Sequence, residues 1–379
     1  MAAPARMIAR RAEIAFLFLG EMLLAPHIWP IIDALARLRL GMPIDLWVST
    51  SAHEALIRDW LGPAHSNVRL RRAPGFHHLG DIAKGHNPPL PSKLPILARL
   101  APRLLRARVV ICAEQTSLWI PRILPFGPRF IFTVHGAGPL NYNPDGRLKC
   151  AYRVLVPSGL HTVEHLANGI LAERIVETGY AKASFAPSLK RTDLFGNERP
   201  VLLYAPHWQR HRSSWWDWGR EIVRLLAMQD RFNVILAPHQ RLFERDPGAR
   251  AVLEEVRALP HVHADDGSFA MVDGSYTAMA DMYLGDSSSQ IVEFLARPRP
   301  CVLLQSPGMA WRTADQGGYQ RCGETVDRID RLWSAIEDAA GRHADYRAFQ
   351  EDFARQALGD TSAEAPLRAA REILASMAR

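Results

Sequence analysis

A run of small hydroxyl residues late in the chain could hold a phosphate group. The segment comprises a predicted strand at 281–285, then Asp286, Ser287, Ser288 and Ser289, then a helix that carries Glu293. Backbone N–H groups and hydroxyls at the start of a helix can donate to phosphate oxygens. A carboxylate one turn inside the helix could accept both hydroxyls of a ribose. A capping serine alone would be ordinary, but the complete arrangement favours nucleotide binding.

Two other predicted strands deliver histidines into the loops at their carboxyl ends. The strand that begins at Phe232 ends at His239 and Arg241, and the strand that begins at Arg129 ends at His135 and Gly136. Histidine can transfer a proton near neutral pH, and arginine can neutralise a diphosphate. A single strand-end histidine is more often structural than catalytic. Three such sites, divided between the two halves of the chain, favour one shared active site.

The surrounding residues alternate between apolar strands and amphipathic helices. In the first half we expect strands at 13–19, 44–49, 67–71, 108–113, 129–134 and 153–157, and helices at 24–38, 55–61 and 161–167. After a polar break at 188–200 we expect strands at 201–205, 233–237, 281–285 and 300–304, and final helices from 327 to 379. Strands that are apolar on both faces and separated by helices are typical of parallel sheets.

These elements predict an α/β protein of two Rossmann-like domains. We expect a basic, acceptor-side domain at residues 1–187, a linker at 188–199, and a nucleotide-donor-binding domain at 200–379. A length of 379 residues suits two domains better than one. Because ligands bind beyond the carboxyl ends of parallel strands, the nucleotide is expected in a cleft between the domains.

Composition narrows the remaining function classes. The hydrophobic fraction of 48% and the charged fraction of 22% are those of a globular protein. The four cysteines, at positions 112, 150, 301 and 322, lack the close spacing of a zinc or redox motif. We therefore expect reduced thiols in a cytoplasmic protein. We also predict no metal site and no cofactor.

The amino-terminal region could be mistaken for a targeting segment. Arg6, Arg10 and Arg11 precede an apolar run, but that run is short and Glu21 soon interrupts it. No stretch approaches the roughly 20 apolar residues that a membrane span needs. Attachment to the inner face of the plasma membrane stays open as an alternative location.

Charge is unevenly distributed along the chain. Residues 1–185 carry 22 Lys and Arg against 12 Asp and Glu, a net charge of +10, whereas the remainder carries 24 against 27. A basic half attracts nucleic acid, anionic lipid or a polyanionic substrate. No recognisable nucleic-acid module is present, so we expect no nucleic-acid partner.

Five short blocks make the chain similar to the CDP-glycerol glycerophosphotransferase family, whose members build teichoic acids and related capsule polymers on a GT-B fold. The blocks are Val134–Gly136, Val154–Ser158 together with Glu177–Tyr180, Leu203–Pro206, Ala237–His239, and Asp286–Ser289 with Glu293 and Phe294. They keep the family's order between about residue 130 and residue 305.

The resemblance implies a role for each matching residue. His135 would act as base on the acceptor hydroxyl, and His239 would lie at the donor phosphates. The implied donor-binding residues are Gly136, Tyr204, Pro206, His207, Arg241, Asp286, Ser287, Ser288, Ser289 and Glu293. The acceptor would attack the phosphorus next to the transferred group and expel a nucleoside monophosphate, through positioning and charge stabilisation without a required metal.

The chain departs from the family pattern at four places. Ser287 replaces a tyrosine, His207 replaces a threonine, Ala181–Ser184 replaces Pro-Arg-Asn-Asp, and Ala137–Asn141 replaces Thr-Pro-Leu-Lys. These positions concern the transferred group or the acceptor more than the nucleotide. Nucleotide binding is therefore a firmer expectation than glycerol phosphate as the group transferred.

We expect a transferase that moves glycerol phosphate, or a similar phospho-polyol or sugar group, from a CDP-activated or other pyrimidine nucleotide donor to a lipid or lipid-linked glycan. One alternative is a UDP-sugar glycosyltransferase or a UDP-N-acetylglucosamine 2-epimerase-like enzyme, because Asp286–Gln290 with Glu293 is also similar to the epimerase ribose site. Against it, Gly20-Glu-Met lacks the Gly-Thr-Arg-Pro-Glu opening of those epimerases. A non-catalytic nucleotide-binding protein is the third alternative.

Two smaller features have two interpretations each. A basic, leucine-rich helix at 91–109 could dock on an anionic membrane or pack its leucines inward as an ordinary surface helix. Trp208, Trp215, Trp216 and Trp218 could stack on a base or sugar, or form core.

Overall fold

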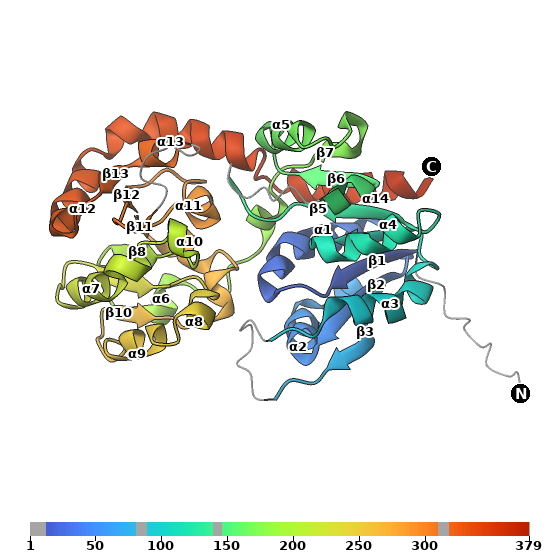
Figure 1. Ribbon diagram of the computed structural model, residues 1–379, viewed down its shortest axis with the longest axis horizontal. Coiled ribbons are helices and arrows are strands. Elements are labelled where there is room, and N and C mark those ends of the chain that lie inside the picture. The colour runs from blue at the N-terminus through green and yellow to red at the C-terminus, as the bar shows by residue number, and fades with distance from the viewer. Residues whose placement is uncertain (1–12, 81–88, 139–145, 310–317, 379) are drawn as a thin grey trace, which may run out of the picture.

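Two parallel sheets form two lobes in the computed structural model, which describes residues 13–80, 89–138, 146–309 and 318–378 (Figure 1). The first sheet has the order β3-β2-β1-β4-β5-β6-β7. Its strands are β1 (Ile14–Phe18), β2 (Ile44–Thr50), β3 (Val68–His77), β4 (Val109–Cys112), β5 (Arg129–Thr133), β6 (Arg153–Val156) and β7 (Ile175–Glu177). We call this sheet with its covering helices the first lobe.

The second lobe repeats the same plan. Its sheet has the order β10-β9-β8-β11-β12-β13. The strands are β8 (Val201–Ala205), β9 (Asn233–Leu236), β10 (Val262–Ala264), β11 (Met282–Gly285), β12 (Cys301–Leu304) and β13 (Glu324–Val326). The strand order reverses at β1 in one sheet and at β8 in the other, and such switch points are where doubly wound sheets bind ligands.

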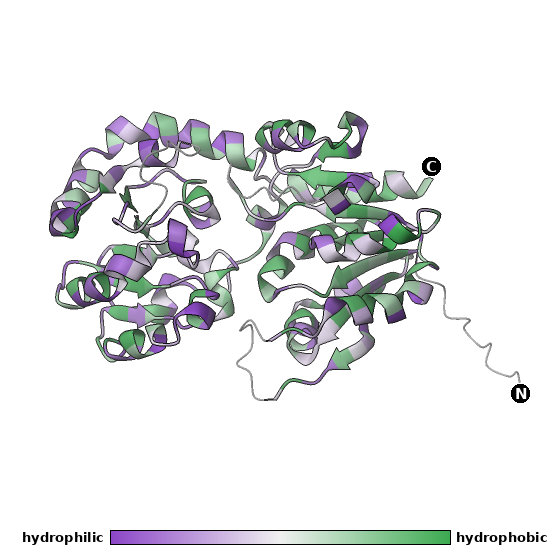
Figure 2. Ribbon diagram, viewed as in Figure 1, coloured by the Kyte–Doolittle hydropathy of each residue, from purple (hydrophilic) through white to green (hydrophobic). Residues whose placement is uncertain are grey.

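Helices cover both faces of each sheet. The first half contains α1 (Ala25–Leu38), α2 (Ser51–Trp60), α3 (Lys93–Leu104), α4 (Trp119–Ile123), α5 (Gly159–Ala167) and α6 (Arg191–Leu194). The second contains α7 (Trp215–Ala227), α8 (Leu242–Arg245), α9 (Ala249–Glu254), α10 (Ser275–Met279), α11 (Ser289–Phe294), α12 (Leu332–Gly341), α13 (His343–Leu358) and α14 (Glu364–Ala378). Figure 2 shows hydrophobic strands between helices whose outer faces are hydrophilic.

Side-chain alternation explains why the central strands are apolar throughout. In β1, Ile14 and Phe16 belong to one hydrophobic cluster of the first lobe, whereas Ala15 and Leu17 belong to a second cluster. Successive side chains of a strand point to opposite faces. Both faces are covered, so every residue of β1 is buried. The predicted α/β architecture of two Rossmann-like sheets is confirmed.

The strands that sequence patterning missed are the weakest in apolar character. β7, β10 and β13 are three residues long, each includes a polar residue, and each forms the outer edge of its sheet. An edge strand has one sheet neighbour and needs no continuous apolar run. The expected carboxy-terminal helical region divides into α12, α13 and α14.

The last helix returns to the first lobe, where Figure 1 places the C-terminus. Ala369, Ala370 and Ile373 of α14 are fully buried in the cluster that contains β1 and α1. Arg153 of β6 donates to Glu372 at 3.0 Å. The chain therefore crosses between the lobes twice, and the division at residues 188–199 stays a prediction.

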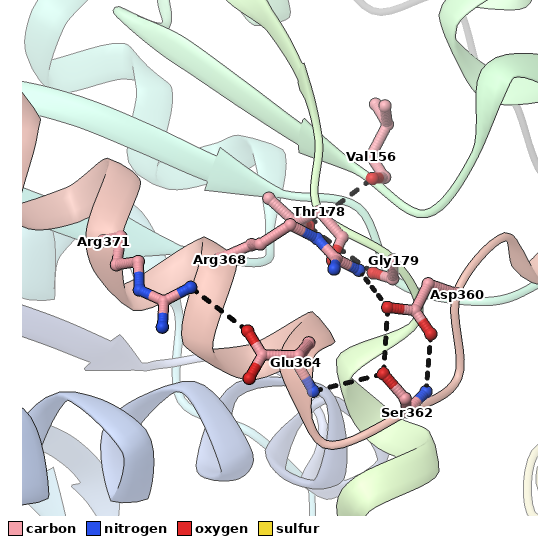
Figure 3. Close-up of polar contacts among 8 residues, drawn as sticks. All are labelled: Val156, Thr178, Gly179, Asp360, Ser362, Glu364, Arg368 and Arg371. Carbon is pink, nitrogen blue, oxygen red and sulfur yellow. Dashed lines mark hydrogen bonds and ion pairs between the residues drawn. The ribbon is translucent and has the colours of Figure 1, made fainter.

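A cluster of hydrogen bonds holds the segment that returns to the first lobe before α14 (Figure 3). Arg368 donates to the backbone oxygen of Thr178 at 3.2 Å and also contacts the Asp360 carboxylate. The backbone N–H of Ser362 donates to Asp360 at 2.8 Å. Gly179 lies within this cluster and has φ of 88°. A Cβ on Gly179 would clash with the backbone oxygen of Asp360 and approach Ala365 Cβ to 2.8 Å.

The Gly179→Ala variant tests this crossing. We expect a loss of about 1–3 kcal/mol in unfolding free energy, because the residue would need a left-handed backbone and would meet the Asp360 carbonyl. Gly341→Ala is the matched control, since no atom lies within 4 Å of a Cβ at that position. Urea unfolding followed by circular dichroism gives both values. Equal stability of the two variants would contradict the account.

Candidate functional site

A cavity of about 390 Å³ lies between the lobes, beyond the carboxyl ends of strands from both sheets. The first lobe lines it with Glu21, Leu23, Leu24, Lys93, Glu114, Gln115, Thr116, Phe132, Val134, His135, Leu148, His161, Glu164 and His165. The second lobe contributes Trp208, His239 and Arg241. The structure thus brings together His135, His239 and Arg241, three of the residues that the sequence singled out.

His135 comes just after β5 and is held as a neutral imidazole. Burial lowers its pKa to about 4, although a hydrogen bond with the Ala113 backbone opposes this shift. Its Nδ1 atom is buried and has no hydrogen-bond partner in the described part of the chain. Because a bond to a backbone carbonyl uses the other ring nitrogen as donor, Nδ1 is left as an acceptor.

The loop after His135 joins the two lobes. Ala137 is fully buried within the hydrophobic cluster of the second lobe. Gly138 has φ of 98°, and a Cβ on it would clash with Tyr319 and lie 3.0 Å from Val292. The loop therefore passes through a space that only glycine fits. Leu140 and Asn141, at which the chain departs from the family pattern, lie outside the described residues.

On the second lobe, loops after β8 and β9 place His207 and His239 with their ring centroids 5.7 Å apart. The His239 backbone N–H donates to Pro206 at 3.1 Å, and its Nδ1 accepts from the Arg241 N–H at 3.2 Å. Burial lowers the pKa of His239 to about 4. Since Nδ1 accepts, the proton of this neutral ring resides on Nε2.

Arg241 connects the lobes at the cavity. Its guanidinium forms an ion pair with Glu21 of the first lobe and lies 5.1 Å from the ring centroid of Trp208. Of the four tryptophans considered, Trp208 alone lines the cavity, whereas Trp215 and Trp218 are buried in the core. A diphosphate bound to Arg241 would compete with Glu21.

The Asp286 side chain holds the serine loop against the loops after β8. Its side chain is fully buried and accepts from the backbone N–H groups of His207 at 2.7 Å and Ser214 at 3.1 Å. Burial raises its pKa to about 6, while these hydrogen bonds lower it. Asp286 therefore ties the β11 loop to the loops after β8. Ser288 caps α11 by accepting from the Gln290 N–H at 3.2 Å.

The remaining predicted donor residues vary in their surroundings. Tyr204 and Pro206 are buried, in and directly after β8. The backbone oxygen of Ser287 accepts a hydrogen bond from Arg212, and Gly136 has a left-handed backbone with φ of 82°. Their ligand roles stay predictions.

Arg212 contacts the predicted serine loop and was missed by the sequence reasoning. Its side chain is buried, and it donates to the Ser287 backbone oxygen at 3.0 Å and to Gln209 at 3.5 Å. Burial lowers its pKa, whereas Tyr319 and Asp286 raise it. The cluster of arginines after the β8 strand was the available signal, but nothing local shows that Arg212 turns inward to the serine loop.

Glu293 lies outside the set that lines the central cavity. Its carboxylate accepts from Lys182 at 2.7 and 2.8 Å and from the Tyr180 hydroxyl. Both partners lie shortly after β7, so this is a second ion pair between segments of the two lobes. The ribose contact predicted for Glu293 stays a prediction, and it would require exchange of these partners.

Other polar cavity residues were also missed. Glu114 lies shortly after β4, is buried, and is 3.8 Å from the Lys93 ammonium. Burial raises the pKa of Glu114, and Lys93 lowers it. Among the described residues, no group of three His, Cys, Asp or Glu is arranged to hold a metal ion.

No family model matches the sequence, and no curated protein matches it. Solved structures do. The wall teichoic acid polymerase TagF has a TM-score of 0.67 at 13% identity, with 97% of this chain and 90% of that chain covered. The Anabaena protein HepE, in complex with UDP and glucose, gives 0.53 at 16% identity, with 96% and 99% covered.

A third similar structure is the UDP-GlcNAc 2-epimerase from Neisseria meningitidis bound to UDP-GlcNAc. It gives a TM-score of 0.57 at 13% identity, with 96% of this chain and 98% of that chain covered. At such identities the similarity concerns the fold. The chain has the GT-B-like fold of these proteins, as the sequence resemblance led us to expect.

The low pKa of His239 predicts a pH dependence of stability. Its folded value of about 4 lies below the ordinary value near 6.5, so stability is complete above about 6.5 and is lost as the pH falls toward 4. His239→Asn keeps an oxygen to accept from the Arg241 N–H but does not titrate there. We expect its unfolding free energy to fall less steeply, by up to about 1.4 kcal/mol per pH unit.

Urea unfolding at several pH values between 4 and 7 measures both slopes. Identical slopes for the unaltered protein and the variant would show that His239 is not held neutral by burial.

Proposed function

We propose that this protein is a transferase that carries glycerol phosphate, or a similar phospho-polyol or sugar group, from a CDP-activated donor to a hydroxyl of a lipid or lipid-linked glycan. The observation that carries the proposal is the cavity between the two sheets. His135 of the first lobe and His239 with Arg241 of the second lobe line the same space. A donor and an acceptor can therefore meet there.

The second lobe supplies hydrogen-bond donors for a diphosphate. The guanidinium of Arg241 and the Nε2–H of His239 both lie at the cavity. Arg212, from the loop after β8, donates to the Ser287 backbone oxygen in the loop after β11, although these residues are not among those that line the cavity. Fixed donors and positive charge in a buried site stabilise the charge that develops on the departing nucleotide.

The first lobe supplies the acceptor side. The unpartnered Nδ1 of His135 can accept a hydrogen bond from an incoming hydroxyl. Its pKa of about 4 makes it a weak base at neutral pH. This imidazole is therefore better suited to orient the hydroxyl than to retain its proton.

The structural neighbours support a nucleotide-activated donor without choosing the base. One TagF structure is described as carrying CDPG after a soak, and HepE is described with UDP-glucose. A UDP-sugar glycosyltransferase is therefore the second candidate, and a UDP-GlcNAc 2-epimerase-like activity is favoured by the third neighbour. A non-catalytic nucleotide-binding protein would bind donor without turnover.

Nucleotide binding tests the donor site. Thermal shift with CDP-glycerol, CDP, UDP-glucose, UDP-GlcNAc and GDP should show stabilisation by one pyrimidine nucleotide class, about 2.7 kcal/mol at 100 times its dissociation constant. Arg241→Gln should weaken this binding by roughly 10- to 100-fold, since a charged hydrogen bond is lost. Arg250→Gln, an exposed arginine on α9, is the control.

Product analysis then separates the candidates. Release of a nucleoside monophosphate supports phosphotransfer, and release of a nucleoside diphosphate supports glycosyl transfer. Epimerisation would proceed without an acceptor. A protein stabilised by no nucleotide would contradict the transferase proposal.

Attachment to an anionic membrane belongs to the same proposal. Most leucines of α3 pack inward, with Leu97, Leu100 and Leu104 buried, which favours the ordinary surface-helix interpretation for that helix. The residues just after the carboxyl end of α3 do not pack inward. Leu105 is exposed and adjoins Gly127, in the loop after α4; Leu124 and Phe126 of this loop and Ile123 at the end of α4 are exposed as well. No helix in the described ranges is long and apolar enough to cross a bilayer.

Exposed cations lie close in sequence to these apolar residues. Arg103 of α3, Arg106 just after α3 and Arg122 of α4 are all exposed, and the Phe126 side chain is 100% exposed. Apolar side chains accompanied by arginines suit the interface of an anionic membrane. An acceptor carried by lipid would then be presented to the first lobe.

Vesicle sedimentation tests this surface. The double variant Ile123→Ser, Phe126→Ser should bind phosphatidylglycerol vesicles at least about 10-fold more weakly than the unaltered protein, because two apolar side chains leave the interface. Met228→Ser is the control, since Met228 is 77% exposed on another element. Binding that is unchanged by the double variant would contradict membrane docking through this loop.

A further inference from the structure

Helix α5 carries unsatisfied polar atoms beside the central cavity. The Nε2 atom of His161 and the Oε2 atom of Glu164 are buried and have no hydrogen-bond partner among the residues described. Both residues line the cavity that holds His135. Buried polar atoms without partners are uncommon and costly, so such atoms on a cavity wall indicate a polar ligand.

The surroundings of His161 determine which kind of hydrogen bond it offers. The Ser158 hydroxyl donates to the backbone oxygen of Ala357 at 3.2 Å, and the same hydroxyl oxygen lies 3.1 Å from His161 Nδ1. Since the serine proton is already used, Nδ1 must be the donor in the second contact. The buried, neutral ring then carries its lone pair on Nε2, which is an acceptor without a partner among the residues described.

Three residues of the first lobe that line the cavity therefore carry an acceptor atom without a partner: His135 (Nδ1), His161 (Nε2) and Glu164 (Oε2). A phosphate, which at neutral pH also mainly accepts, is poorly matched to these atoms. Adjacent hydroxyl groups, each with a proton to donate, are well matched. The lining residues of the second lobe, Arg241 and His239 with its Nε2–H, have the reverse polarity.

We propose that His161 and Glu164 of α5, together with His135, form the acceptor subsite, which we call the α5 wall. This subsite binds a polyol or sugar with adjacent hydroxyls, and Glu164 takes the proton of the attacking hydroxyl. This inference rests on the proposed transferase function. It holds for either a phospho-polyol or a sugar donor, because both need a deprotonated acceptor oxygen.

The acidity of Glu164 is suited to that role. Burial raises its pKa to about 7, whereas the pKa of His135 is lowered to about 4. A general base is most effective when its pKa is near the working pH. Glu164 is therefore the stronger base of the two in this cavity.

The titratable and charged groups around Glu164 come from α5, from the second lobe and from the rest of the cavity lining. They are His161 and His165 on α5, Tyr319 of the second lobe, and His135, Lys93, Glu114, Glu21, His239 and Arg241 of the cavity lining.

For a phosphate donor, one bond forms and one breaks at phosphorus. The acceptor oxygen forms a bond to the phosphorus that carries the transferred group. The bond from that phosphorus to the bridging oxygen breaks, and its electron pair leaves with the nucleoside monophosphate. The hydroxyl proton moves to Glu164 Oε2 and is then lost to solvent.

The test compares Glu164→Gln with Glu173→Gln, an exposed glutamate outside the cavity. Binding of CDP-glycerol and UDP-glucose is measured by thermal shift. Turnover is measured as nucleotide released from each donor with glycerol as surrogate acceptor, between pH 5.5 and 8.5. In the unaltered protein and Glu173→Gln, turnover should rise with pH through about 7.

Glu164→Gln should bind donor as the unaltered protein does, lose the pH dependence near 7, and turn over about 10²- to 10⁴-fold more slowly. Glu164→Asp should retain the pH dependence at reduced rate, which separates a loss of the base from a loss of folding. Turnover by Glu164→Gln at the unaltered rate and with the same pH profile would overturn this inference and leave the transferase proposal intact. Absence of donor binding, or binding without turnover by the unaltered protein, would instead overturn the proposed function itself.

Discussion

The loop from His135 to Gly138 holds the two lobes together at the place where both sheets end. Ala137 lies in the core of the second lobe although it comes after a strand of the first, and Gly138 has no room for a side chain beside Tyr319. The position of His135 is thereby set by both lobes at once. Two ion pairs between segments of the two lobes, Glu21 with Arg241 and Lys182 with Glu293, act on the same junction. Desolvation offsets much of the attraction in partly buried pairs, so such pairs are weak evidence for stability, and we expect these two to act mainly on the geometry of the junction.

This junction gives the cavity two walls of opposite character. Histidines line both walls, but their hydrogen-bonded surroundings differ, so that His239 offers a proton and His135 offers a lone pair. Burial keeps both rings neutral, because a charged imidazole would lose its hydration. Under the proposed function, the direction of these hydrogen bonds, together with the charge of Arg241, would distinguish a diphosphate from a hydroxyl. Hydrogen bonding likewise accounts for the burial of Asp286. Its carboxylate accepts from two backbone N–H groups and so holds the serine loop in place.

The sequence predicted most of the fold because central parallel strands are apolar on both faces, as β1 and β8 are. It predicted the strand-end histidines because a strand fixes where its next loop must lie. It could not predict Arg212 or Glu164, whose importance depends on which way a loop or helix face turns in the tertiary structure. Nor could it reveal that Glu293 meets Lys182, since these residues lie far apart in the chain and only the contact between the lobes joins them. The return of α14 to the first lobe is hidden for the same reason, as its buried residues would suit either core.

We propose that a nucleoside diphosphate occupies the cavity between the carboxyl ends of the two sheets. A crystal structure of the protein soaked with CDP is the sharpest test. If the diphosphate binds there, its density will lie against Arg241 and the Nε2 atom of His239, Glu21 will be displaced from the guanidinium, and the α5 wall will be left open. Nucleotide density elsewhere on the protein, with the ion pair between Glu21 and Arg241 intact, would contradict it.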